Sequence, residues 1–192
     1  MSKISINKDS VKLVIILACI ALVSSLLLAV INLFTQVDEE AKLREAIGKT
    51  YSSPLTEEEI DFSGYDNIEK AEILEMFKAE DGAIIILSKS TNCYNATNGI
   101  SLLVIIKDND IVKVAPYSHG ETPGLGTNAL TEAYLGRYEA LEVSDFNIGE
   151  VDGATPWDYT KVENYTGATK SSNGVRDAVT NAVRAYVLVE WR

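Results

Sequence analysis

The stretch ENYTGATKSSNGVRDAVTNAVRAYV occupies residues 163–187, and the rest of the chain can be interpreted outward from it. Its second half repeats apolar residues at intervals of three and four, which is typical of a helix with one buried stripe. Ser172 or Asn173 is the natural N-cap of this helix. We therefore predict a C-terminal helix whose regular part starts at Val175. Its stripe is Ala178, Val179, Ala182, Val183, Tyr186 and Val187.

The turn before this helix has the features of a phosphate site. Thr169 is expected just ahead of the helix N-terminus, where backbone N–H groups and the positive end of the dipole favour a phosphate. Gly167 and Ala168 let the backbone approach a ligand closely, and Lys170 adds a cation. The alternative is a small-residue loop that only caps the helix, because Ser and Thr are common at such positions.

A second segment, HGETPGLG at residues 119–126, predicts a tight and rigid loop because glycines and a proline lie close together. Its backbone can lie flat against a planar ligand, since Gly has no Cβ. Glu121 and Thr122 supply hydrogen-bonding groups. A purely structural loop is the alternative. We interpret His119 as a partly exposed loop residue in preference to a proton carrier.

Both segments resemble motifs of one family, the membrane-anchored flavoprotein subunits of the Rnf and Na⁺-translocating NADH:quinone reductase complexes. The family's flavinylation motif is Asp-x-x-Ser/Thr-Gly-Ala-Thr-x-Ser/Thr, and Glu163 stands here where the family has Asp. The second family motif, Glu-Thr-Pro-Gly-Leu-Gly, is present at residues 121–126. The likeness covers nearly the whole chain, because both motifs follow a single N-terminal span in the family's order. The flavinylation match comprises Thr166, Gly167, Ala168, Thr169 and Ser171.

The resemblance implies an FMN cofactor joined to Thr169 by a phosphoester bond, which a dedicated flavin transferase installs. Thr169 is then an attachment site, and no residue has to act as a catalytic base or nucleophile in turnover. Glu121 and Thr122 are expected to contact the isoalloxazine ring or the ribityl chain, with Leu125 against the ring. The other expected cofactor-binding residues are Thr166, Gly167, Ala168, Lys170, Ser171, Ser172, Gly124 and Gly126.

A second Gly-Ala-Thr at residues 153–155 serves as an internal control. It has Asp152 where the family has Ser or Thr, and Trp157 where the later hydroxyl is expected. Gly149 takes the place of the acidic residue, and no helical stripe follows closely. Thr155 is therefore not the predicted attachment site.

The predicted elements, given below, indicate an α+β fold, and the resemblance implies a role as the covalent FMN-binding member of an Rnf electron transport complex. That protein is a flavin relay in electron transfer between ferredoxin and NAD⁺, coupled to Na⁺ or H⁺ transport. Its expected partners are the other membrane subunits and, during maturation, the flavin transferase. The alternatives are the equivalent flavoprotein of the Na⁺-translocating quinone reductase, which is longer, and an anchored FMN-binding module outside such a complex. An anchored binding protein without a redox role is the non-flavin alternative.

A membrane helix is predicted at residues 13–34, which are almost wholly apolar and carry no charge. The apolar core is too long for a cleaved signal peptide, and no small-x-small site follows it. Lysines precede the span and acidic residues 38–40 follow it, so the positive-inside rule places the N-terminus in the cytoplasm. We therefore predict a single-pass protein of the inner membrane with an extracytoplasmic globular domain.

Composition excludes several classes of function. The formal net charge of -11 argues against binding to nucleic acid, whose phosphates would be repelled. Two cysteines are too few for a disulfide framework, and one histidine excludes multi-His metal sites, so no metal is predicted. Nothing near a serine resembles a nucleophile elbow.

The rest of the chain predicts a mainly antiparallel sheet with flanking helices. Strands are expected at 83–88, 100–107 and 111–116, the last two joined by a hairpin at 108–110, and another within 141–148. Helices are expected at 38–51, 56–59 and 129–138, whereas 71–79 is ambiguous. The predicted organisation is a cytoplasmic N-terminus at 1–12, the span at 13–34, a stalk and helical linker at 35–82, and an FMN-binding domain at 83–192.

Overall fold

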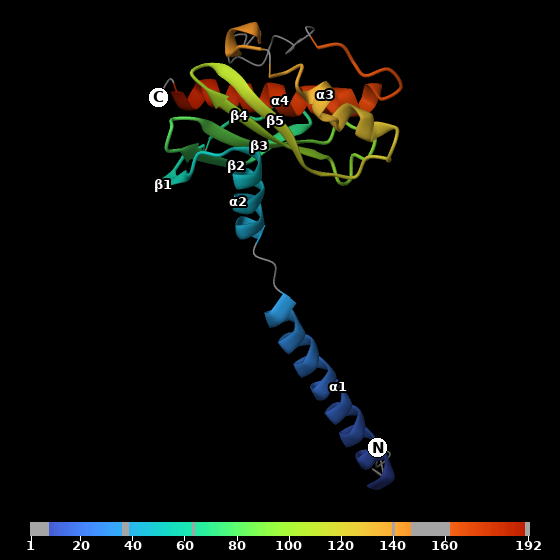
Figure 1. Ribbon diagram of the computed structural model, residues 1–192. Coiled ribbons are helices and arrows are strands. Elements are labelled where there is room, and N and C mark those ends of the chain that lie inside the picture. The colour runs from blue at the N-terminus through green and yellow to red at the C-terminus, as the bar shows by residue number, and fades with distance from the viewer. Residues whose placement is uncertain (1–7, 36–38, 63, 140, 147–161, 191–192) are drawn as a thin grey trace. The chain divides into compact units, whose positions relative to one another are not determined.

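The computed structural model describes residues 8–35, 39–62, 64–139, 141–146 and 162–190. The chain forms two compact units, Met1–Leu43 and Arg44–Arg192, which are described separately. In the first unit, helix α1 covers Lys8–Thr35 (Figure 1). Its segment Val11–Ile31 is long and apolar enough to cross a membrane, and its side chains are exposed. A helix that is apolar on every side and uncovered by protein has the character of a membrane span.

Helix α2, Glu39–Thr50, was predicted at 38–51 and belongs partly to each unit. Within the second unit, its Ile47 is buried and the Arg44 guanidinium lies 5.4 Å from the ring centroid of Phe77. Tyr51, which follows the helix, donates a hydrogen bond of 2.5 Å to Asp81. These contacts fix the end of α2 to the sheet that follows it.

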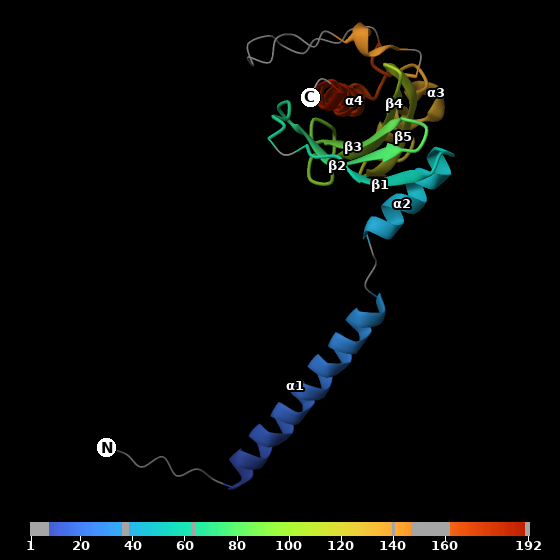
Figure 2. The same ribbon diagram turned by 90° about the vertical axis from the view of Figure 1, so that its left-hand side faces the viewer.

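The second unit contains five antiparallel strands in the order β1-β2-β3-β4-β5 (Figures 1 and 2). The α+β class with an antiparallel sheet and helices is therefore confirmed. The bounds are β1 Leu55–Glu59, β2 Ala71–Ala79, β3 Ile84–Ser90, β4 Ile100–Lys107 and β5 Asp110–His119.

The prediction of a short helix at 56–59 was wrong, because this segment is the edge strand β1. Pairing with β2 supplies the hydrogen bonds that a helix would have made internally, and acidic side chains suit an exposed edge. The ambiguous segment 71–79 is β2, which pairs with both β1 and β3. The range predicted as stalk and linker, 35–82, thus contributes two strands to the sheet of the globular unit.

Strands β3 and β4 are buried on both faces. Ile86 and Val104 belong to the main core, whereas Ile85 and Ile105, on the opposite face, are also fully buried. A strand that is covered on both faces carries a continuous run of apolar residues in place of alternating apolar and polar ones. This explains the sequences IIIL at residues 84–87 and LLVII at residues 102–106. The β4–β5 hairpin was predicted correctly: Asp108 and Asn109 adopt φ values of 52° and 68°, as a tight two-residue turn requires.

Helix α4, Thr169–Glu190, lies across one face of the sheet (Figures 1 and 2). The predicted stripe forms its buried side. The helix begins six residues before the predicted regular start at Val175, so an N-cap at Ser172 or Asn173 was wrong. The Ser172 hydroxyl accepts a hydrogen bond of 2.9 Å from the N–H of Tyr165, while the N–H of Ser172 donates to the Ala168 carbonyl. Ser172 therefore stabilises the preceding turn from inside the first helical turn.

The helix predicted at 129–138 is broken into short pieces. A 3₁₀ helix, η1, covers Gly126–Leu130, and the one-turn α3 covers Glu132–Leu135. Residues 143–145, predicted as part of a strand, form the 3₁₀ helix η2, and only an isolated bridge joins Asp110 to Glu142. Residues 147 and 148 of that predicted strand lie outside the described residues. The buried rings of Tyr134 and Tyr138 meet edge to face and anchor this irregular segment to the core.

Candidate functional site

The two sequence motifs line one pocket at the N-terminal end of α4. Its volume of about 500 Å³ falls within the range of about 300–1,000 Å³ for small-molecule sites. The segment after β5 contributes Glu121, Thr122, Leu125 and Gly126, and the turn before α4 together with its first residues contributes residues 167–171. Tyr94, from the loop between β3 and β4, completes the lining.

Three predicted site residues do not line this pocket: Thr166, Gly124 and Ser172. Thr166 and Gly124 are exposed in turns, and Ser172 is buried beneath the start of α4. His119 is exposed and absent from the lining, but it is the last residue of β5, paired with Ile100, and not the loop residue that was predicted. Thr155, with the rest of the second Gly-Ala-Thr, lies outside the described residues.

The turn at Gly167 determines how α4 begins. Gly167 has φ +86°, a left-handed conformation that glycine adopts without a steric penalty, and a Cβ there would have no atom within 4 Å. The following N–H, of Ala168, donates to the Tyr165 carbonyl. Thr169 is then the first helical residue, and its side chain and that of Lys170 are exposed. The N–H groups of a first helical turn have no intrahelical acceptor, so this end favours an anion.

Glu121 joins the two motifs. Its carboxylate is only 4% exposed and accepts hydrogen bonds from the Ser171 hydroxyl and from the N–H of Asn95, the latter at 3.0 Å. Both carboxylate oxygens are therefore engaged with protein, although the residue borders the pocket. A Cβ on Gly126 would collide with the Glu121 carboxylate and the Ser171 hydroxyl. Glycine at 126 is thus required by the close approach of loop and helix.

Internal hydrogen bonds fix the loop at residues 121–127. The Thr122 carbonyl accepts from the N–H groups of Leu125 and Thr127, at 3.2 and 3.3 Å. The Thr127 hydroxyl in turn accepts from the N–H of Gly124, which has φ +75°. This rigid turn holds Leu125 at the pocket, where the residue is 60% exposed.

Sequence reasoning missed the contribution of the loop at residues 91–99. Tyr94 lines the pocket, and Asn95 bonds to Glu121 through its backbone. Cys93 is buried, and its thiol donates a hydrogen bond of 3.3 Å to the Asn95 carbonyl. Burial, and then the charge of Glu121, raise the pKa of the Cys93 thiol to about 11, so it is protonated at neutral pH. The one pattern in this loop is a glycosylation sequon at 95–97, which carries no information about a pocket.

Comparison with known proteins finds a family match over the part of the chain that contains both motifs. Residues 97–184 match the FMN-binding domain family. The matched segment contains β4, β5, the loop after β5 and most of α4, whereas Tyr94 precedes it. The chain also aligns with the crystal structure of Shewanella oneidensis NqrC at 18% identity and a TM-score of 0.45, covering 78% of this chain and 88% of that chain. No curated protein matches the chain.

The chemistry of the lining fits FMN. A phosphate suits the N-terminus of the 22-residue α4 beside Lys170. A planar ring system suits the apolar part of the lining, where Tyr94 and Leu125 are exposed.

Proposed function

We propose that this chain is a membrane-anchored electron-relay flavoprotein, a subunit of an ion-translocating ferredoxin:NAD oxidoreductase of the Rnf type. In this proposal FMN is bound covalently through Thr169. The observation that carries it is the meeting of both motifs at one pocket, with Thr169 at the start of α4. The match of residues 97–184 to the FMN-binding domain family supports the choice of FMN.

The start of α4 supplies what a phosphoester at Thr169 needs. The Thr169 side chain is exposed, so a transferase can reach its hydroxyl. The ester replaces the hydroxyl hydrogen by the phosphoryl group, with a net loss of one water. The remaining phosphate charge then lies near the helix N-terminus and Lys170, both of which stabilise an anion.

The other residues of the pocket hold and orient the ring. Glu121 fixes the loop after β5 to α4, and Leu125 offers an apolar surface. When bound, FMN supplies one- and two-electron chemistry, so a relay can connect donors and acceptors that differ in electron number. The chain itself positions the flavin ring and keeps water from the part of the ring inside the pocket. No side chain is assigned the role of a base.

The anchor determines which steps belong to partners. A single span such as Val11–Ile31 cannot form an ion path alone, so ion transport belongs to other membrane subunits. The lysines ahead of the span favour a cytoplasmic N-terminus and an extracytoplasmic relay. Covalent attachment then retains the cofactor in a compartment where free FMN is scarce.

The test is intact mass and in-gel flavin fluorescence of the full chain, produced together with a flavin transferase. The wild type should gain the mass of one FMN less one water, and Thr169→Ala should gain none. The matched control is Thr155→Ala, in the second Gly-Ala-Thr, which should carry flavin. Covalent flavin in Thr169→Ala would refute the attachment site, and a wild type without flavin would refute the flavoprotein proposal.

Membership in an Rnf complex needs a separate experiment. In membranes from the native host, reduced ferredoxin should reduce the covalent flavin of the wild type. In membranes that carry Thr169→Ala, this covalent flavin signal should be missing. Reduction by NADH with quinone as acceptor, and no response to ferredoxin, would assign the chain to a quinone reductase instead.

A further inference from the structure

The segment before α4 folds back along the helix that follows it. After the turn at Gly167, Ser172 and Arg176 are four residues apart and therefore lie on the same side of α4. The Ser172 hydroxyl accepts a hydrogen bond of 2.9 Å from the N–H of Tyr165, and the Arg176 guanidinium donates to the side-chain oxygen of Asn164. Two successive residues of the segment thus contact two successive turns of the helix.

The bond of Arg176 holds the part of the segment that is farther from the turn. The Ser172 hydroxyl and the bond between the Ala168 N–H and the Tyr165 carbonyl tie down the residues next to the turn, whereas Arg176 ties down Asn164 beyond them. Both side chains of the Arg176–Asn164 pair are half-buried. A hydrogen bond from a charged donor is stronger than one between neutral groups, so this pair extends the contact by a full helical turn.

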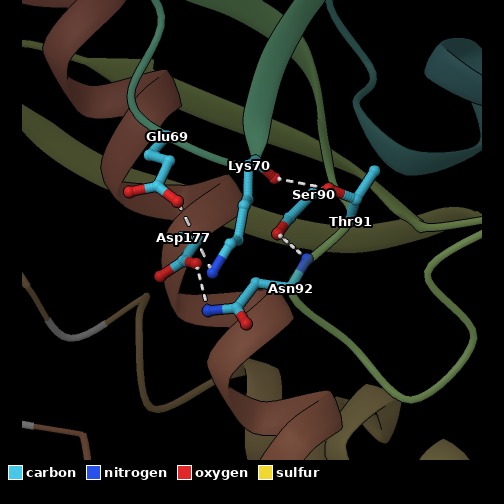
Figure 3. Close-up of polar contacts among 6 residues, drawn as sticks. All are labelled: Glu69, Lys70, Ser90, Thr91, Asn92 and Asp177. Atoms are coloured by element: carbon cyan, nitrogen blue, oxygen red, sulfur yellow. Dashed lines mark hydrogen bonds and ion pairs between the residues drawn. The ribbon is translucent and has the colours of Figure 1, made fainter.

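The residue next to Arg176 holds a different segment of the pocket. Asp177 accepts a hydrogen bond of 2.7 Å from the side-chain amide of Asn92, and Figure 3 shows the two side chains facing each other. Asn92 belongs to the loop at residues 91–99, which supplies Tyr94 to the pocket lining. Successive helical residues point about 100° apart, so neighbours on α4 reach two separate segments.

From this arrangement we propose that Arg176 is a positioning residue for the attachment of flavin to Thr169, and that it acts through Asn164. The inference rests on the proposed function and deepens it. By holding the segment against α4, Arg176 keeps the turn closed, so that a transferase meets the Thr169 hydroxyl in one defined place. In the attachment step the Thr169 Oγ–H bond breaks and an Oγ–P bond forms to a flavin dinucleotide. The P–O–P bond of that donor breaks, and the leaving nucleotide takes the proton.

Neither member of the pair is specified by the flavinylation motif. Asn164 occupies one of its unspecified positions, and Arg176 lies beyond its last residue, Ser171. Slower attachment in variants of this pair therefore reports the position of the segment and not the loss of a motif residue.

The first measurement is hydrogen exchange, followed by mass spectrometry, on the full chain produced without flavin. Arg176→Ala should speed exchange in peptides that cover residues 162–168 by about tenfold, because the segment is released from the helix. Peptides from the loop at residues 91–99, which Asp177 holds, should exchange as in the wild type. Arg44→Ala, on α2, removes the same charge and is the matched control, with both segments unchanged.

The second measurement is the rate of attachment with purified flavin transferase and FAD, followed by intact mass. We expect kcat/KM to fall about tenfold in Arg176→Ala and in Asn164→Ala, with no further fall in the double variant, because each change removes the same bond. Asn164→Asp keeps an oxygen facing the guanidinium, so its rate should stay near that of the wild type. Arg44→Ala should also react at the wild-type rate.

The outcomes separate this inference from the proposed function. If the wild type takes up flavin and Arg176→Ala does so equally fast, the role of Arg176 is refuted while the proposed function stands. The same holds if Arg176→Ala slows attachment without changing the exchange of residues 162–168, or if it reacts faster, since the transferase would then need a released segment. If the wild type takes up no flavin, both are refuted.

Discussion

The hydrogen bond between Ser171 and Glu121 joins two motifs that lie 50 residues apart, and it can be tested by a double-mutant cycle. The cycle compares Glu121→Ala, Ser171→Ala and the double variant. If the bond holds the loop after β5 to α4, the double variant should lose less stability than the sum of the losses in the two single variants.

The magnitude follows from the partners of Glu121. Its carboxylate is 4% exposed and accepts two hydrogen bonds, and each bond to a charged group contributes about 1.5–3 kcal/mol to stability. Removal of a buried charge opposes this loss, but two donors are then left without their acceptor, and that penalty dominates. We expect Ser171→Ala to cost about 1.5–3 kcal/mol and Glu121→Ala about 3–6 kcal/mol. The coupling energy should be about 1.5–3 kcal/mol, because the shared bond is counted in both single variants.

The assay is equilibrium denaturation of the full chain in detergent, followed by far-UV circular dichroism. Glu132→Ala is the matched control, since this carboxylate is 90% exposed and its ion pair with Lys113 contributes little. If the stability losses of the single variants add, with a coupling energy below about 0.5 kcal/mol, the argument that this bond holds the site together is refuted.

Three further predictions concern the same unit. Gly126→Ala should lower the free energy of unfolding by about 1–3 kcal/mol, because the new Cβ meets Glu121 and Ser171. Gly48→Ala, on α2 with no atom near its Cβ, is the control and should raise the free energy of unfolding by about 0.5–1 kcal/mol. Equal effects of the two variants in denaturation would contradict the crowding at Gly126. Native Cys93 should alkylate about a hundredfold more slowly at pH 8 than in unfolded protein, since its pKa is about 11; equal rates by mass spectrometry would refute burial of the thiol. Burial raises the pKa of Asp177, so the folded state binds this proton more tightly and loses stability as pH rises through that pKa. The Tm of Asp177→Asn minus that of the wild type should therefore increase as pH rises above about 4, the ordinary pKa of an aspartate, and a constant difference would contradict it.

The sequence predicted best those elements whose signal is local. The stripe of α4 repeats over several turns, and the hairpin at Asp108 and Asn109 uses residues that tolerate positive φ. Residues of both motifs line one pocket, whereas their binding of FMN, which their resemblance to one family implies, stays a prediction. Each of these depends on patterns within a few residues, or on a motif long enough to be specific.

Two of the failures have a common physical origin, which is pairing with distant residues. Segment 56–59 has a helix-like sequence but becomes β1 because β2 offers hydrogen-bond partners. The contribution of Tyr94 was missed because its anchors are Asp177 on α4 and Glu121 after β5, both remote in sequence. No periodicity within residues 91–99 reports such contacts.

Ser171 and Ser172 show why motif residues cannot be assigned roles from sequence alone. Successive residues on a helix point about 100° apart, so two adjacent hydroxyls must meet different surroundings. Once α4 begins at Thr169, Ser171 faces Glu121 at the pocket and Ser172 faces the backbone of Tyr165. A start at Val175 would have left both outside the helix and free to turn. The helix boundary therefore decides which hydroxyl joins the two motifs, and that boundary depends on Gly167 adopting φ +86°. It follows that Gly167→Ala, although it meets no steric contact, should disturb the site more than its open surroundings indicate.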